Sequence, residues 1–195
     1  GYTGIQHAQN VLKMANAEQF VTMVNESGSA ADIQYVENAI QRFGRSRVNP
    51  NIPNVNTDWY REVLRDAPIT NHSLGITGGG ENSNYGINTS YFAQEGILDM
   101  KNEYERFNIQ GNIDIDVSDR FKVGVNSAFS NATKYNPENG AWFQAYFAVP
   151  ILPKYDYTNT AADPIPFSDA TLLGYRGSQN PFPAMTFNDN QLRIR

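Results

Sequence analysis

The sequence predicts a mainly β protein whose antiparallel strands belong to a transmembrane β-barrel, with short helices in the first long loop. Three observations favour this class. Apolar and polar side chains alternate over long segments, long connections alternate with tight ones, and no apolar run approaches the roughly 20 residues of a membrane-spanning helix. A closed barrel needs about eight strands or more, so this chain alone does not close one, and we expect an excerpt of a longer protein.

The clearest alternation lies at residues 104–117. From Phe107 onward every second side chain is apolar except at Gly111, and the residues between them are polar or charged. Successive side chains of a strand point to opposite faces, so this strand has one apolar face and one hydrated face. The pattern is long enough for a tilted strand to cross a bilayer, which takes about 9–11 residues.

The 195 residues carry a formal net charge of -5 and include no cysteine. No basic stripe is present to neutralise phosphates, which argues against nucleic acid as a partner. Without cysteine there is neither a disulfide framework nor a Cys-based metal site. The two histidines show no metal-binding spacing, and no pattern indicates a cofactor.

We treat residues 1–195 as one partial β-barrel domain with five stretches. They are the end of a strand (1–6), a helical external loop (7–69), four antiparallel strands with tight turns at 79–84 and 117–120 (70–132), a long external loop (133–190) and the start of the next strand (191–195). Outer-membrane barrels alternate short periplasmic turns with longer external loops. The two tight turns are therefore expected to face the periplasm.

Local patterns place three helices in the first loop. Asn16 starts the first with the pattern of a capping box. The second runs from about Asp32 to Gly44, a suitable C-terminal cap. Asp58 or Thr57 caps the third. In the last loop, residues 141–149 form an apolar island that suits a short helix.

The alternation assigns side chains of the strands to two environments. Those expected to face lipid are Leu74, Ile76, Tyr85, Ile87, Tyr91, Phe107, Ile109, Ile113, Ile115, Phe121, Val123, Val125 and Phe129. Those expected to face a hydrated lumen are Arg106, Asn108, Gln110, Asn112, Asp114, Lys122 and Asn126. Aromatic residues near the strand ends are typical of the interfacial girdles of such barrels.

Several segments, in this order and spacing, resemble the SusC/RagA family of TonB-linked outer-membrane transporters of the Bacteroidetes. They are residues 56–59 (NTDW), 67–74 (APITNHSL), 78–80 (GGG), 91–97 (YFAQEGI), 106–109 (RFNI), 117–124 (VSDRFKVG) and 150–153 (PILP). The resemblance runs from the first residues to about Tyr157. It implies a barrel of the 22-strand class with a plugged lumen. It also implies nutrient uptake, with import of oligosaccharides or peptides, a SusD-like surface lipoprotein as lid, and TonB acting through a plug region outside this chain.

Two clusters could carry chemistry. Asp114 and Asp116 share one face about 6.5–7 Å apart, a spacing that overlaps that of an inverting glycosidase. A hydrated wall lined with polar side chains is the stronger interpretation, so we expect no catalytic residue and no enzyme. The densest aromatic cluster suits sugar or peptide binding, although long loops also need a small core. Its candidate ligand-binding residues are Trp142, Phe143, Tyr146, Tyr155 and Asp156, with Tyr157 beside them.

The leading hypothesis is therefore a part of a TonB-dependent importer in the bacterial outer membrane. One alternative is a secreted, soluble, all-β glycan-binding module, in which Ile109, Ile113, Val123 and Val125 would be buried under a second sheet. A glycoside hydrolase, based only on Asp114 and Asp116, is the other alternative.

Overall fold

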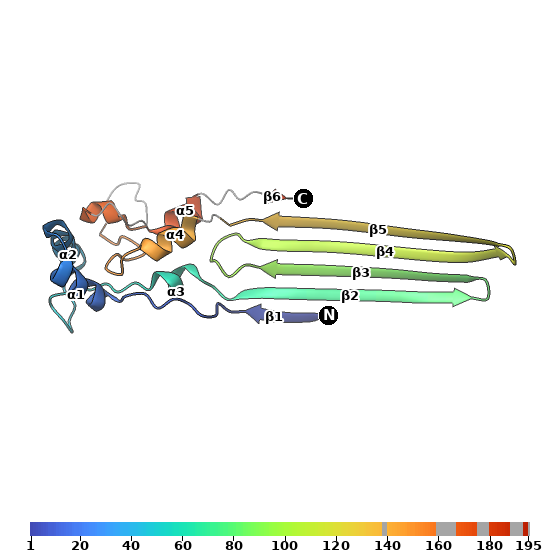
Figure 1. Ribbon diagram of the computed structural model, residues 1–195, viewed down its shortest axis with the longest axis horizontal. Coiled ribbons are helices and arrows are strands. Elements are labelled where there is room, and N and C mark those ends of the chain that lie inside the picture. Colours follow the sequence, from blue (N-terminus) through green and yellow to red (C-terminus); the bar gives the residue numbers. More distant parts are fainter. Residues whose placement is uncertain (138–139, 159–166, 175–179, 188–192, 195) are drawn as a thin grey trace.

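The computed structural model describes residues 1–137, 140–158, 167–174, 180–187 and 193–194. Over this part of the chain one antiparallel sheet extends from a group of short helices, which we call the cap (Figure 1). The cap consists of residues 7–66 and 96–102, together with the described residues between 136 and 187. Cap and sheet lie end to end, so most of the strand length extends beyond the cap.

The sheet has six strands, and each pairs antiparallel with the next one in sequence. The strands are β1 (Tyr2–Gln6), β2 (Ala67–Gly80), β3 (Ser83–Glu95), β4 (Glu103–Ser118), β5 (Phe121–Tyr135) and β6 (Arg193–Ile194). The antiparallel, mainly β architecture predicted from the sequence is confirmed. The sheet is open, with β1 and β6 at its edges, and a 22-strand barrel stays a prediction.

The strands are longer and the turns shorter than the sequence suggested. Only Glu81 and Asn82 lie between β2 and β3, whereas the glycine run suggested a turn over 79–84. Gly78 and Gly79 instead pair with Tyr85 and Asn84, whose side chains cover the space that a Cβ would need. Glycine in a strand often marks such a close approach, which local sequence alone does not reveal.

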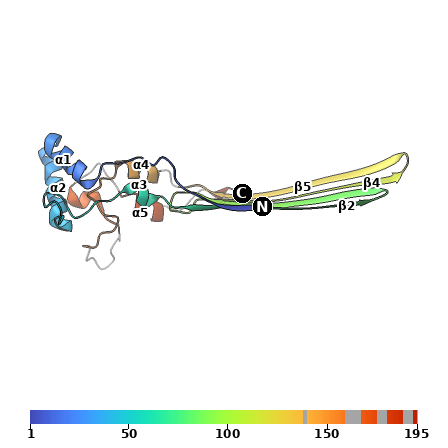
Figure 2. The same cartoon turned by 90° about the horizontal axis from the view of Figure 1, so that it is seen from below.

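The sheet is a single layer. Figure 2, turned by 90° from Figure 1, shows no helix against either face of the long strands. Residues predicted to face lipid therefore have no second sheet above them within the described chain. This arrangement is the opposite of the buried sandwich that a soluble glycan-binding module requires.

The helices all lie in the cap. They are α1 (Ala17–Ser27), α2 (Ala30–Phe43), α3 (Trp59–Val63), α4 (Gly140–Phe147), the 3-10 helix η1 (Ala170–Leu173) and α5 (Pro181–Phe187). Among the residues that the structure describes, no helix is long and apolar enough to cross a membrane.

The helix starts follow local capping chemistry. Asn16 and Gln19 form a reciprocal capping box at α1. The second helix begins earlier than Asp32, because Ser29 is the N-cap and Asp32 closes the box three residues later. Asp58 caps α3, which decides between the two predicted candidates. Gly44 ends α2 with φ of 84°, a conformation that glycine adopts without strain.

The cap has its own apolar core, drawn from all three connections. Its largest contributors are Val21, Tyr35, Val36, Ile40, Trp59, Val63, Leu98, Met100, Ile151, Leu152, Leu173, Phe182 and Met185. Hydrogen bonds cross between the loops: Trp59 Nε1 donates to the Val149 carbonyl at 2.8 Å, and Thr57 Oγ1 donates to the Leu152 carbonyl at 2.8 Å. The first and last long loops therefore fold together as one body.

Candidate functional site

The apolar face of the sheet is exposed along its length. All side chains expected to face lipid lie on this face, and their exposed fractions range from 39% for Ile115 to 63% for Leu74. Ile113 lies between Tyr85 and Val125 on the neighbouring strands. Soluble monomers rarely expose a continuous apolar surface of this size.

This apolar face has a clear boundary at its end nearest the cap. Glu105 is on the same face, in the row of Ala93 and Thr133, and the Tyr91 hydroxyl donates to its carboxylate at 3.2 Å. From Phe107 to Val117 the strand rises about 34 Å. At a tilt of about 45° that distance spans about 24 Å, close to the ~25 Å apolar band of outer-membrane barrels.

The opposite face of the sheet is polar, and it carries every residue expected to face a lumen. Asn108 lies at its centre. Its Nδ2 donates to Ser90 Oγ at 3.0 Å, and its Oδ1 accepts from Ser130 Oγ at 2.7 Å. Asn108 is therefore held in one orientation by the strands on both sides.

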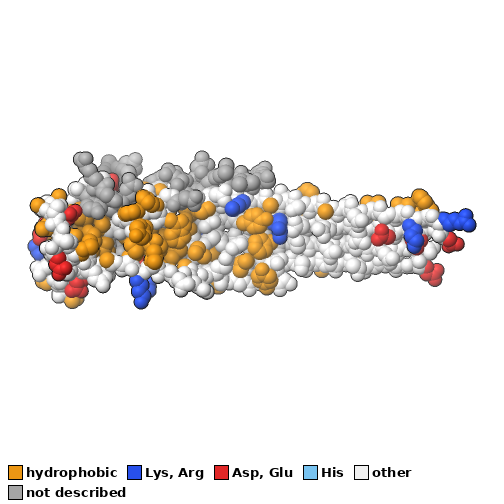
Figure 3. Space-filling model, in the orientation of Figure 1, with side chains coloured by type: hydrophobic (Ala, Val, Ile, Leu, Met, Phe, Trp, Pro, Cys, Tyr) orange, Lys and Arg blue, Asp and Glu red, His pale blue; other side chains and the backbone are white. Residues whose placement is uncertain are grey.

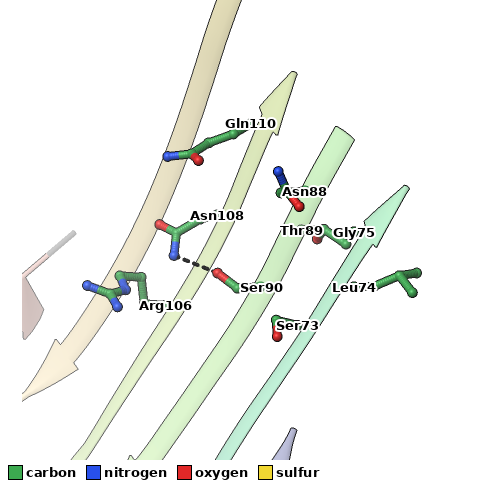
Figure 4. Close-up of a pocket in the computed structure, with 9 residues that line it drawn as sticks. All are labelled: Ser73, Leu74, Gly75, Asn88, Thr89, Ser90, Arg106, Asn108 and Gln110. Carbon is green, nitrogen blue, oxygen red and sulfur yellow. Dashed lines mark hydrogen bonds between the residues drawn. The ribbon is translucent and has the colours of Figure 1, made fainter. Parts of the chain in front are cut away.

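A shallow groove of about 410 Å³ runs over this row (Figure 4). Its polar lining comes from β2, β3 and β4. These side chains are Ser73, Asn88, Ser90, Arg106, Asn108 and Gln110. Sequence alternation identified the β4 members, but it could not reveal which residues of β2 and β3 lie beside them.

Glycines on the polar face make room for the side chains opposite them. A Cβ added at Gly75 or Gly124 would lie 2.5 Å from Asn88 Oδ1 or Asp114 Oδ1. The side chains of Asn88 and Asp114 therefore lie over the neighbouring strands instead of projecting straight into the space above the sheet. The polar side chains of this face therefore lie close to the backbone, and hydrogen-bonding groups are dense on it.

The structure gives no support for a hydrolase site at the paired acids. Asp116 accepts a 2.9 Å hydrogen bond from Lys122 Nζ, so its charge is already paired. Asp114 is exposed on the open sheet, outside the lining of the groove. Glycoside hydrolysis needs two carboxyl groups on either side of a bound sugar, and here one of the two is paired with a lysine on an open sheet. No group of metal-ligating side chains occurs among the described residues.

The predicted aromatic cluster separates into two groups. In α4, Ala141 and Ala145 are buried in the cap, whereas Phe143, Tyr146 and Phe147 face outward. Phe143 is 67% exposed, and its ring centroid lies 4.5 Å from that of Phe147. In Figure 3 hydrophobic side chains gather over the cap and in a patch at the cap end of the sheet. The rest of the sheet face seen in this view carries few of them.

Trp142 and Tyr155 make ring contacts within the cap, whereas Tyr157 is 86% exposed. Tyr155 stacks on Phe167 at 5.5 Å, and Phe167 stacks on Phe182 at 5.9 Å. Trp142 packs against Tyr60 of α3, with ring centroids 6.0 Å apart. The sequence allowed two interpretations of these residues, ligand binding or packing in a small loop core. These ring contacts are of the second kind.

Asp156 is part of this internal structure. Its side chain is 1% exposed and accepts from Arg42 at 2.6 Å and from the Thr158 hydroxyl at 2.6 Å. Burial acts to raise the pKa of Asp156, but the hydrogen bonds from Thr158 and the paired Arg42 together outweigh it, so the pKa lies below its usual value. The carboxylate joins α2 to the last loop and is not available to a ligand at the surface.

Because of this ion pair, the stability of the cap is expected to change with pH in the acidic range. A carboxyl with a lowered pKa stabilises the folded state above its usual pKa of about 3.9, and that contribution is lost as pH falls through the folded-state pKa. Replacing Asp156 with Asn is expected to destabilise the cap by about 2 kcal/mol at pH 7, because Arg42 loses its charged partner. Hydrogen exchange of α2 amides should show a difference between wild type and variant that shrinks below pH 4. A difference independent of pH would contradict this role.

Comparison with known proteins identifies three related receptors, although no family profile matches the chain. The chain is 35% identical over 130 residues to TonB-dependent receptor P3 of Formosa agariphila, and 30% identical over 157 residues to receptor P26 of that organism. It is 27% identical over 162 residues to TonB-dependent receptor SusC of Bacteroides thetaiotaomicron. The matches cover 67% to 80% of this chain but only 11% to 16% of the relatives. The chain belongs to the SusC-like family of TonB-dependent receptors.

Proposed function

We propose that this segment forms part of the wall and outer entrance of a TonB-dependent transporter in the outer membrane, which imports glycans or peptides. The observation that carries the proposal is the two-faced open sheet. One face exposes a continuous apolar band of about bilayer thickness, and the other is lined with amides, hydroxyls and a few charges. The apolar face suits contact with lipid, and the polar face suits contact with a hydrated lumen.

The orientation follows from the connections. The two tight turns at one end of the sheet face the periplasm, and the cap at the other end lies outside the cell. The boundary at Glu105 then marks the outer membrane surface, so the ends of β2 to β5 nearest the cap project above the lipid. This arrangement follows the rule of short periplasmic turns and long external loops.

Ligand contact in this proposal comes from the exposed aromatic residues of α4. Phe143 and Tyr146 offer flat rings to a sugar or peptide that approaches the entrance. Trp142 and Tyr155 contribute mainly by holding the cap in shape, since both make ring contacts within it.

Two partners complete the proposed transporter. TonB acts through a plug region outside this chain. A SusD-like lipoprotein covers the entrance and contacts the cap, where Met23 of α1 and Ile33 of α2 are exposed apolar side chains that a protein partner could cover.

Paired cysteine variants test the environment of the two faces. In the full-length receptor, Ile113→Cys is expected to react with a membrane-partitioned maleimide and resist a charged aqueous one. Asn112→Cys, its neighbour on the opposite face, should show the reverse preference. The segment has no native cysteine to give background labelling. Equal labelling of both positions by the aqueous reagent would contradict a lipid-facing sheet.

A further inference from the structure

The groove on the polar face contains one positive charge without a counter-charge. Arg106 makes no hydrogen bond or ion pair with any residue in the described part of the chain. Its sequence neighbour Glu105 points to the other face, where Tyr91 holds it. The nearest acid along the same face of β4 is Asp114, about 27 Å away by strand rise. The guanidinium is therefore open to an external anion.

The rest of the groove suits a ligand rich in hydroxyl groups. Ser90, Asn108 and Ser130 form a hydrogen-bonded row across three strands, which fixes their positions before a ligand arrives. Asn88 and Gln110 are exposed and lie opposite each other in the next row of the same face, on the side away from the cap. Their amides can each donate to and accept from a sugar hydroxyl.

An aromatic pair lies at the cap end of the groove. Phe92 is directly opposite Arg106 in the strand register, and its ring centroid is 5.9 Å from that of Tyr104. Both residues point to the polar face, because Tyr104 lies two residues from Arg106 on β4. Rings, neutral amides and a single guanidinium are thus arranged along one line of the sheet.

We propose that this groove binds an acidic oligosaccharide, with the Arg106 guanidinium pairing with a carboxylate or sulfate group and the amide row binding the neighbouring hydroxyls. The inference rests on the proposed import function and specifies its substrate class. Planar guanidinium and carboxylate groups form paired hydrogen bonds that a neutral sugar does not offer.

A peptide fits the groove less well. Peptides commonly bind sheets by adding a strand to a free edge. Here β3 and β4 are paired on both sides along the groove, so the main chain beneath its centre has no free edge. Only β2 has a free edge beside the groove, because its pairing with β1 ends at Asn71. The lining also has no apolar pocket for peptide side chains.

The test uses the purified full-length receptor and a panel of acidic oligosaccharides, each with its carboxyl-esterified or desulfated counterpart, together with acidic tripeptides. At least one acidic glycan is expected to bind, to bind more weakly as salt rises, and to lose about tenfold affinity in Arg106→Gln. Arg106→Lys should recover part of that affinity. Lys122→Gln removes a cation from the same face outside the groove and should bind like wild type.

The outcomes separate the two proposals. Carboxylate and sulfate sources are distinguished by which chemical modification abolishes binding. Binding only of neutral glycans, or equal affinity for the acidic glycan in wild type and Arg106→Gln, overturns the acidic-ligand inference and leaves import intact. An equal loss for acidic and neutral glycans in Arg106→Gln also overturns it, and indicates that Arg106 pairs with another part of the receptor. Binding only of peptides overturns the inference, and binding of neither class counts against the proposed import function itself.

Discussion

Replacement of Trp59 with alanine is expected to lower the free energy of unfolding of the cap by about 3–5 kcal/mol. Trp59 is 2% exposed, packs on Phe182, and donates from Nε1 to the Val149 carbonyl. The substitution removes a large side chain from the place where the first and last loops meet. It also removes the shorter of two hydrogen bonds that the Val149 carbonyl accepts, and leaves the 3.3 Å bond from the Leu152 amide.

Hydrogen exchange in the assembled receptor measures this effect, because it reports cap opening separately from the sheet. Amides of α3 and α4 should exchange at least a hundredfold faster in Trp59→Ala. Trp59→Phe retains most of the packing and should give a smaller increase. Val48→Ala is the matched control, since Val48 is 96% exposed in the same loop. Faster exchange confined to α3, with α4 unchanged, would contradict a shared core.

Replacement of Ile113 with arginine is expected to prevent or strongly reduce assembly of the receptor in the outer membrane. Ile113 lies on the apolar face between Tyr85 and Val125, well inside the band bounded by Glu105. A lipid-facing arginine near the midplane of a barrel costs about 2–4 kcal/mol. Assembly is measured by heat-dependent migration of membrane fractions.

Asn112→Arg is the matched control for this variant. Asn112 is adjacent in sequence but lies on the polar face, opposite Asn126. The same charge there should enter a hydrated environment and leave assembly near wild-type levels. Equal loss of assembly in both variants would contradict the assignment of the two faces, because strand alternation would then have no relation to the membrane.

The faces of the sheet could be predicted from the sequence because the information is local. Alternation with a period of two determines which side chains share a face, whatever the strand pairs with. All residues from Phe107 to Phe129 that were expected on the apolar face lie there. The helix starts at Asn16 and Asp58 are local for the same reason, since a cap needs only its own first turn.

The composition of the cap and the groove could not be predicted in this way. Arg42 and Asp156 meet across 114 positions in sequence, and nothing near either residue indicates the other. The aromatic residues around Trp142 and Tyr155 read as one cluster in sequence, yet α4 turns some outward and the loop core takes the others. The groove needs the registers that set Ser73 beside Ser90 and Ser90 beside Asn108. The first depends on a β2–β3 turn shorter than the glycine run suggested, and the second on the longer connection between β3 and β4.

The shared core of the cap has a consequence for how such receptors diversify. External connections of a barrel ordinarily vary in length independently, since each is anchored only at its own two strands. Here an insertion in the first connection would displace partners contributed by the last, as at Thr57 and Leu152. Recognition of new nutrients is therefore expected to evolve by point substitution at exposed positions such as Phe143, while the lengths of these two connections change together or not at all.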